Sequence, residues 1–368
     1  MIRVPGDVPT LQEAVDGAQP GDLILLSPGT YRGGILVPED RPGITIQGTD
    51  RNRVVFDGRD GLPSAVVVRA DHVALQNFTA HNYTSNAIQW VGVTGFRGRY
   101  LTVWNVGGYG LFAEGSRRGR LDHDLSSGAG NSAYYIGECD PCRAVITNVV
   151  ARFSAIGYSG TNASGRLAVT HSLWDRNGTG ILPNSYNEES HPPQQEALFA
   201  NNTVRASGAV PTPATDPLGG FVGIGIGIAG GQRDVVSGNT VTGSARYGVA
   251  LFPTLQRGGT SWKPSENAVV DNVVRSSGIA DLAVSGGVGA GNCFDGNRFS
   301  SSLPRGVERT FQCLEGPRPR RAGDASVARQ LAVPAPVAYA RSAPRPSYRD
   351  MPPPGPQPNM PGSNRPPG

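Results

Sequence analysis

Residues 134–180 read YYIGECDPCRAVITNVVARFSAIGYSGTNASGRLAVTHSLWDRNGTG, and this stretch holds two consecutive copies of one unit. Tyr134-Tyr135-Ile136-Gly137 opens the first copy and Tyr158-Ser159-Gly160 opens the second. Val145-Ile146-Thr147-Asn148 corresponds in the same way to Ala168-Val169-Thr170-His171, which gives an offset of about 23 residues. A period of about 20 to 25 residues, with short alternating apolar runs and turn residues between them, is typical of a β-solenoid. Each copy is then one coil.

The position of Asn148 and His171 recurs along the chain after short apolar runs. Its members are Asn77, His123, Asn148, His171, Asn202, Asn239, Asn272 and Asn297. A buried Asn can satisfy its amide by bonding to the Asn of the next coil, so we expect an inward polar ladder at this position. Asp122 and Asp124 flank His123 in a strand and therefore share the opposite face. A structural role for these three residues is favoured over an acid–base or metal cluster.

These repeats resemble those of the right-handed parallel β-helix proteins of the pectate-lyase-like superfamily, over roughly residues 2–313. The segments Ile136–Cys142 and Gly160–Gly165 are similar, more narrowly, to a branch found in actinobacteria. The resemblance implies an all-β, single-stranded right-handed parallel β-helix of about ten to twelve coils. It does not imply one activity, because the superfamily includes lyases, hydrolases, esterases, epimerases and adhesins. The motifs of its pectate lyases, polygalacturonases and alginate epimerases are missing from this sequence.

The composition divides the chain into residues 1–315, one long β-helix domain, and residues 316–368, a Pro/Arg-rich tail. Thr10 and Glu13 form a capping-box pattern, and the apolar face that follows predicts a short helix covering the N-terminal end of the solenoid. Proline lacks a backbone N–H and cannot join a sheet ladder. We therefore expect a disordered tail, apart from one or two helical turns at Asp324–Leu331.

The charge pattern excludes some partners. The formal net charge is +4, and much of it lies in the tail, so the body is near neutral and we expect no nucleic-acid binding. No segment is long and apolar enough to predict a membrane span. We expect a monomer without a metal or another cofactor.

The four cysteines form two pairs, Cys139 with Cys142 and Cys293 with Cys313. About six coils separate the pairs, which at about 4.8 Å per coil excludes a single four-cysteine metal site. Two disulfides are favoured, and a redox or metal pair at Cys139 and Cys142 remains the alternative. Disulfides favour an extracellular or cell-envelope location, although the segment that begins Met1-Ile2-Arg3-Val4 lacks the charged and apolar regions of a signal peptide.

Three loops interrupt the period at Pro183–Glu196, Ala206–Gly220 and Pro253–Asn267. The first and third follow corresponding strands, so we expect them to project from the corner where Cys139–Cys142 also turns. A groove bounded by two long loops suits an extended polymer. The residues predicted there are Glu188, Glu189 and His191 for catalysis, and Glu138, Asp140, Arg143, Arg166, Gln195, Arg233, Trp262 and Lys263 for substrate binding.

The sequence therefore predicts an exported β-helix protein that binds a polysaccharide along a lateral groove. If the groove is catalytic, the protein is a polysaccharide lyase, hydrolase or epimerase. The alternative is a non-catalytic envelope scaffold or adhesin whose stacked face contacts another protein.

Overall fold

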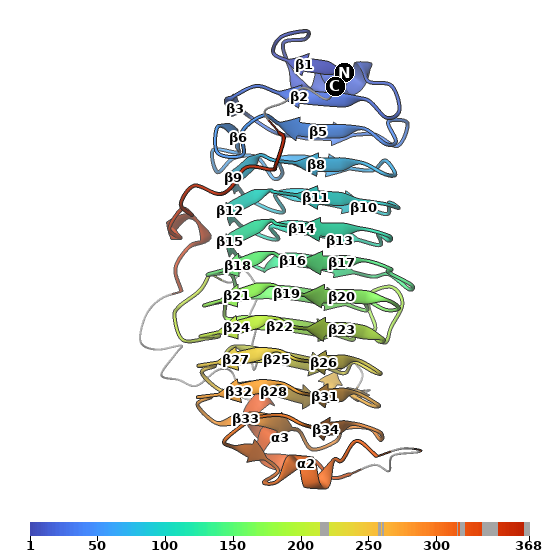
Figure 1. Ribbon diagram of the computed structural model, residues 1–368, viewed down its shortest axis with the longest axis vertical. Helices are drawn as coiled ribbons and strands as arrows, with labels where there is room; N and C mark the ends of the chain where they lie inside the picture. Colours follow the sequence, from blue (N-terminus) through green and yellow to red (C-terminus); the bar gives the residue numbers. More distant parts are fainter. Residues whose placement is uncertain are drawn as a thin grey trace.

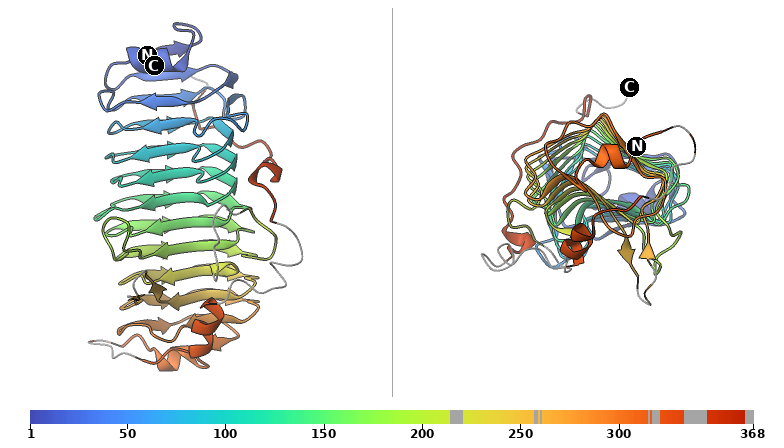
Figure 2. Two further views of the ribbon diagram at one scale, coloured as in Figure 1. Left: turned by 180° about the vertical axis from the view of Figure 1, so that it is seen from behind. Right: turned by 90° about the horizontal axis from the view of Figure 1, so that it is seen from below.

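The computed structural model describes residues 1–213, 221–256, 259, 261–314, 316, 321–332 and 345–363. Its strands stack into three long sheets that follow the length of an elongated molecule (Figure 1). Each coil contributes one strand to each sheet in turn, so every third strand along the chain is a neighbour in the same sheet. Viewed along the axis, the coils superimpose as a tube (Figure 2).

The three sheets are named here A, B and C. Sheet A contains β1 (Ile2–Val4), β2 (Leu23–Leu26), β5 (Thr45–Gly48), β8 (Ala74–Gln76), β11 (Arg97–Arg99), β14 (Arg120–Asp122), β17 (Val145–Thr147), β20 (Leu167–Thr170), β23 (Ala197–Ala200), β26 (Val235–Ser237), β31 (Ala268–Val270) and β34 (Cys293–Asp295). Sheet B contains β3 (Gly29–Tyr31), β6 (Val54–Asp57), β9 (Thr79–Tyr83), β12 (Thr102–Val106), β15 (Leu125–Ala129), β18 (Val150–Arg152), β21 (Leu173–Asp175), β24 (Thr203–Arg205), β27 (Thr240–Thr242) and β32 (Val273–Arg275). Sheet C contains β4 (Ile35–Val37), β7 (Val66–Val68), β10 (Ile88–Val91), β13 (Leu111–Glu114), β16 (Ser132–Gly137), β19 (Ile156–Thr161), β22 (Thr179–Asn184), β25 (Ile224–Ala229), β28 (Tyr247–Phe252), β33 (Ala280–Val284) and β35 (Ser302–Leu303).

The register of the strands confirms the repeat seen in the sequence. Tyr134 pairs with Tyr158 in sheet C, and Val145 pairs with Ala168 in sheet A, both in parallel. Parallel strands need a crossover between them, and here the rest of each coil provides it. Alternate side chains of each strand point into the tube, where Tyr134, Tyr158 and Trp174 are fully buried and meet edge to face.

The polar ladder forms only in the second half of the solenoid. Each ladder Asn donates from Nδ2 to Oδ1 of the next, from Asn202 to Asn239 at 3.0 Å, then to Asn272 at 2.9 Å and to Asn297 at 2.9 Å. All four are buried, so each amide needs these partners. The prediction is confirmed for these residues.

The ladder prediction is wrong for His123, Asn148 and His171, which are exposed and have φ between 51° and 59°. The corner from sheet A to sheet B has two residues, of which the first takes the left-handed conformation and points outward. The second points inward, and it is Asp124 in the coil of His123 and Ser172 in the coil of His171. A shift of one residue exchanges inside and outside.

Short helices cover both ends of the tube. At the N-terminal end, α1 (Leu11–Gly17) has the predicted capping box between Thr10 and Glu13 and buries three apolar residues. At the other end lies α2 (Val307–Thr310), whose Glu308 accepts from Asn297 Nδ2 at 2.9 Å. The helix therefore ends the ladder with a carboxylate, so that no ladder donor is left unpaired at this end.

The tail contains the helical turns expected at Asp324–Leu331, and a second described stretch of it contacts the solenoid. Helix α3 (Ala325–Ala332) lies against sheet C, where Val327 is fully buried and Asp324 N–H donates to Val284 O at 2.7 Å. Residues 345–363, which include the 3₁₀ turn η2 (Tyr348–Asp350), follow the outside of the first coils (Figure 1). Proline excludes ladder pairing but not docking of an extended segment by side-chain contacts.

Both predicted disulfides are present, between Cys139 and Cys142 and between Cys293 and Cys313. The second joins the last strand of sheet A to the segment after α2, at the open end of the tube. Among the described residues, no helix has the length and apolar character needed to cross a bilayer.

Candidate functional site

Two of the three predicted loops leave from the corner between sheets C and A, as the sequence predicts, whereas the loop between β24 and β25 leaves from the corner between sheets B and C. The loop after β22 and the hairpin of β29 (Thr254–Leu255) and β30 (Ser261–Trp262) both follow strands of sheet C. Single parallel β-bridges join successive coils at this corner, between Gln195 and Gln232 and between Gln232 and Ser265. These loops form a wall along one edge of the outer face of sheet C.

Aromatic side chains cover part of that outer face. Phe112 of β13 and Tyr135 of β16 stack at 4.8 Å between ring centroids, with the planes 22° apart. Tyr109 meets Tyr135 edge to face at 5.2 Å. Phe112 and Tyr135 are largely covered, at 8% and 3% exposed, and Tyr109 is half-buried, so a ligand could reach mainly Tyr109 and the edges of this group.

Three half-buried carboxylates lie beside these rings, and we name them the carboxylate cluster: Glu114, Glu138 and Glu189. Glu114 ends β13, Glu138 follows β16 one coil later, and Glu189 reaches in from the loop after β22. Tyr135 donates its hydroxyl to Glu189 Oε2 at 3.4 Å, and Ser190 N–H donates to Glu138 Oε2 at 3.2 Å. The loop therefore contributes one carboxylate and positions another.

Burial and the neighbouring carboxylates raise the pKa of two members of the cluster, Glu114 and Glu189. Burial, the charge of Glu138 and a hydrogen bond shared with Glu138 raise the pKa of Glu114. Burial, followed by the charge of Glu138, also raises the pKa of Glu189, although hydrogen bonds from Thr161 and Tyr135 partly oppose this. Like charges close together cannot all ionise easily, so the cluster retains a proton at higher pH than isolated carboxylates do.

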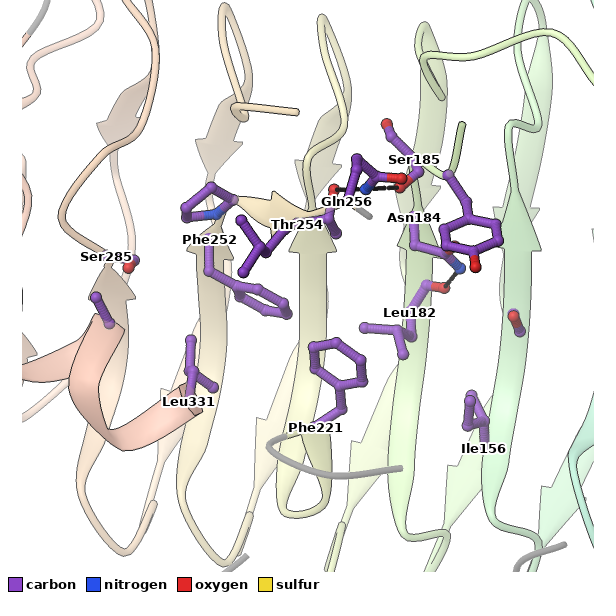
Figure 3. Close-up of a pocket in the computed structure, with 15 residues that line it drawn as sticks. Ile156, Leu182, Asn184, Ser185, Phe221, Phe252, Thr254, Gln256, Ser285 and Leu331 are labelled. Atoms are coloured by element: carbon purple, nitrogen blue, oxygen red, sulfur yellow. Dashed lines mark hydrogen bonds between the residues drawn. The ribbon is translucent and has the colours of Figure 1, made fainter. Parts of the chain in front are cut away.

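An apolar pocket of about 650 Å³ continues the same face toward the C-terminal coils (Figure 3). Leu182, Phe221, Phe252 and Leu331 line it, and Phe221 stacks on Phe252 at 5.6 Å. Ser159, which also lines the pocket, pairs with Tyr135 in the sheet register. The pocket therefore begins one strand beyond the carboxylate cluster on the same sheet, although none of the three carboxylates lines it, and we name the strip from the cluster to the pocket the groove.

Comparison with known proteins agrees with this architecture. The family model described as right handed beta helix region matches residues 86–254. The fold is a right-handed parallel β-helix. No curated protein matches this chain.

Solved structures share the β-helix at low identity. Endo-xylogalacturonan hydrolase from Aspergillus tubingensis is 11% identical, with 80% of this chain and 89% of that chain covered and a TM-score of 0.56. An alginate lyase from a Paenibacillus species is 17% identical, with 74% and 94% covered and a TM-score of 0.51. The A-module of a mannuronan C-5 epimerase from Azotobacter vinelandii is 15% identical, with 79% and 92% covered and a TM-score of 0.50. At these identities the likeness shows the fold alone.

The β-helix brings some of the predicted catalytic residues together and separates others. Glu189 lies beside Glu138, but the exposed Glu188 accepts from Tyr186 Oη at 3.0 Å. His191 is exposed and forms no hydrogen bond or ion pair with a residue that the structure describes. The partner of Glu189 is therefore another carboxylate and not His191.

The stacking role of Trp262 stays a prediction, and the structure gives its indole a further contact. Its Nε1–H donates to Asn187 Oδ1 at 2.6 Å, and Asn187 N–H donates to Gln256 Oε1 at 2.8 Å. These bonds join the hairpin to the loop after β22. Trp262 therefore stabilises the wall of the groove, which in turn holds the loop that carries Glu189.

The predicted basic residues lie at the corner between sheets C and A but point away from the carboxylate cluster. Arg143, Arg166 and Arg233 are exposed, have positive φ and precede strands of sheet A. Arg233 donates to Glu196 Oε1 at 3.1 Å and to Gln195. Asp140 and Lys263 are exposed as well. The remaining predicted residues therefore lie mainly on the outer surface of the corner.

Glu114, Tyr109, Phe112 and the pocket were not predicted from the sequence. Glu114 pairs with Gly137 in the register, directly before Glu138, so the period could have placed the two carboxylates side by side. Among the described residues, no group of three His, Cys, Asp or Glu is arranged to hold a metal ion.

Proposed function

We propose that this β-helix binds a polysaccharide in the groove along sheet C and hydrolyses it with the carboxylate cluster. The observation that supports the proposal is the arrangement of Glu114, Glu138 and Glu189 beside the stacked rings of Phe112 and Tyr135. Solved proteins of this fold include polysaccharide hydrolases, lyases and epimerases, which makes a glycan a reasonable ligand. We also propose an extracellular or cell-envelope location, supported by the two disulfides.

The chemistry requires one protonated and one ionised carboxyl. In glycoside hydrolysis a carboxylic acid protonates the leaving oxygen, and a second carboxylate activates water or attacks the sugar. We assign the acid to Glu189, because its raised pKa favours the protonated form and its loop faces the groove. We assign the base or nucleophile to Glu138, which the Ser190 N–H holds in place. Glu114 sits next to Glu138 and opposes simultaneous ionisation.

The charge of the groove favours a neutral substrate. Among the residues that the structure describes, no Lys or Arg forms an ion pair with a carboxylate of the cluster, and Arg233 is paired elsewhere with Glu196. A polyuronate would bring many carboxylates close to an acidic site, which is unfavourable without a compensating cation. Lyase and epimerase reactions on polyuronates are therefore less favoured than hydrolysis of a neutral glycan.

A substrate panel tests this proposal. Neutral glucans, xylans and mannans, with alginate and polygalacturonate as the acidic comparison, would be incubated with the chain, and new reducing ends and retention in affinity electrophoresis would be measured. We expect a neutral glycan to be bound and cut. Glu138→Gln and Glu189→Gln should each reduce turnover at least about 100-fold, because each removes one partner in proton transfer.

The matched control is Glu188→Gln, which alters an exposed carboxylate next to Glu189 in sequence and should keep turnover within about threefold of the original. Binding of polyuronates alone would contradict the choice of substrate. Binding without any new reducing ends would contradict hydrolysis, and binding of no glycan at all would favour a scaffold or adhesin.

A further inference from the structure

A second face of the molecule is occupied by the chain itself. Residues 345–363 run along the outside of sheet B in the first coils, and Figure 1 shows this segment in dark red beside β9, β12 and β15. The turn η2 contacts β12 and β15, and the segment then continues toward the N-terminal end. Its central part, Met351-Pro-Pro-Pro-Gly-Pro-Gln-Pro-Asn-Met360, favours the extended polyproline II conformation because proline fixes φ.

Polar side chains of the solenoid bind the backbone of this segment at defined positions. Asn52 donates from Nδ2 to Gln357 O at 2.9 Å and accepts from Gln357 N–H at 2.7 Å. Asn77 accepts from Met360 N–H at 2.7 Å, while its own Nδ2 donates to Gly48 O at 2.7 Å and so fixes the amide. Five of the residues from Met351 to Met360 are prolines without an N–H, and Gln357 and Met360 are two of the residues that have one.

A buried arginine adds to this set. Arg51 is 2% exposed and is held by Thr102 Oγ1, to which its Nε donates at 2.8 Å. From that position its Nη1 donates to Pro358 O at 3.3 Å and its backbone N–H donates to Asn359 Oδ1 at 2.5 Å. Asn105 Nδ2 donates to Arg349 O at 3.1 Å at the other end of the contact. The partners come from several coils and follow one extended path.

An aromatic surface lies under the prolines. His81 of β9 and Trp104 of β12 stack at 4.4 Å with their planes 18° apart. Pro353, Pro354 and Pro356 line, together with this pair, a cavity of about 250 Å³ between the tail and sheet B. Aromatic surfaces flanked by hydrogen-bonding groups that contact backbone atoms are the usual means by which proteins recognise polyproline II segments.

We propose that the outer face of sheet B from β6 to β15 is a binding site for extended proline-rich peptides, and that residues 345–363 are its resident ligand in the same chain. The side-chain contacts recognise backbone groups at fixed spacings, so binding does not require the covalent connection through residues 333–344. Occupancy in the intact chain requires only that the dissociation constant lie below the effective concentration of the tethered segment, on the order of 1 mM. This inference is independent of the proposed hydrolysis, because it concerns another sheet.

A cleavable version of the full chain tests the site. A specific protease recognition sequence inserted after Ala338 would allow the complete chain to be folded, purified and then cut. We expect the released peptide to remain bound at high protein concentration and to dissociate on dilution, with a dissociation constant below about 1 mM by fluorescence anisotropy of a labelled peptide 345–363. Asn52→Ala and Trp104→Ala should weaken binding at least about fivefold each. A peptide carrying Gln357→Pro keeps the extended conformation but lacks the N–H that Asn52 accepts, so it should also weaken binding by about fivefold or more.

Asn148→Gly is the matched control, because Asn148 occupies the same corner column as Asn77 but lies outside the contact, and it should leave peptide affinity unchanged. Three results would overturn the proposal. The first is a peptide that does not rebind at 1 mM, and the second is a peptide that leaves only when the solenoid melts, which would make it an integral part of the fold. The third is formation of dimers by the uncut chain with exchange of tails, which would assign the ligand to a second copy. Circular dichroism melting of each variant separates loss of the site from loss of folding.

Discussion

Removal of one ladder residue should weaken the C-terminal half of the solenoid. Asn239 donates to Phe199 O at 2.8 Å and to Asn272 Oδ1 at 2.9 Å, and its Oδ1 accepts from Asn202 N–H at 2.9 Å and Asn202 Nδ2 at 3.0 Å. Asn239→Ala removes all four bonds and leaves the Asn202 N–H buried without its side-chain acceptor. One orphaned donor costs about 1 to 3 kcal/mol and each of the three other lost bonds about 0.5 to 1.5 kcal/mol, so we expect a loss of about 2.5 to 7.5 kcal/mol.

The comparison variant is Asn148→Gly at an exposed corner, where φ is 54° and glycine is well tolerated. Asn148 makes one side-chain bond, to Asp122 Oδ1 at 3.2 Å, so its loss should cost less than about 1 kcal/mol. Equilibrium unfolding in urea, followed by circular dichroism and by tryptophan fluorescence, would measure both. Because repeat proteins can unfold in segments, the midpoints of the two probes should be compared as well. Equal midpoints for the two variants would refute the assignment of the ladder to Asn239 and its neighbours.

Two further predictions concern pH and the disulfide at the open end. Burial raises the pKa of Asp124 and of Asp234 to about 7, so the folded chain keeps protons that the unfolded chain loses near the ordinary value of 3.8. The free energy of unfolding should therefore fall as pH rises from about 4 to about 8, by up to about 4 kcal/mol per group. Thermal melts at several pH values should show a flatter pH dependence for Asp234→Asn. An unchanged slope would contradict the burial of a protonated Asp234. Replacing Cys293 and Cys313 by Ser opens a loop of 20 residues and should lower the free energy of unfolding by about 3 kcal/mol. Hydrogen exchange should become faster in the last coils alone, and faster exchange across the whole solenoid would argue against a local role.

The β-helix could be predicted from the sequence because the same strand and turn pattern recurs in successive coils. The offset between Tyr134 and Tyr158 and the matching offset in sheet A fix the coil, and the register in the structure follows both. The failure at His123 and His171 has a local cause. Both residues of the corner between sheets A and B are polar or small in several coils, so the pattern alone does not show which one points inward. Only the second-half coils, with Asn239 and Asn272 in sequence, have the polar amide at the inward position.

The groove was harder to predict than the fold because its residues are not repeated. The period could have paired Glu114 with Glu138, since the register places one coil above the other. Glu189 could not be placed in this way, because its position depends on the path of an irregular loop and on its bond to Tyr135. His191 was predicted as the partner of Glu189 because the two are close in the chain, whereas His191 is exposed in the structure.

The tail shows why composition alone is an incomplete guide to order. A proline-rich segment cannot fold by itself, because it buries little apolar surface and forms no ladder. Here the ordering comes from the solenoid, whose Asn52, Asn77 and Arg51 supply the hydrogen bonds that the segment cannot make internally. Those three residues lie about 300 positions earlier in the chain, so no local pattern could connect them to the tail. The two proposed sites therefore use different sheets and different residues, and loss of peptide binding in Trp104→Ala should leave glycan turnover intact.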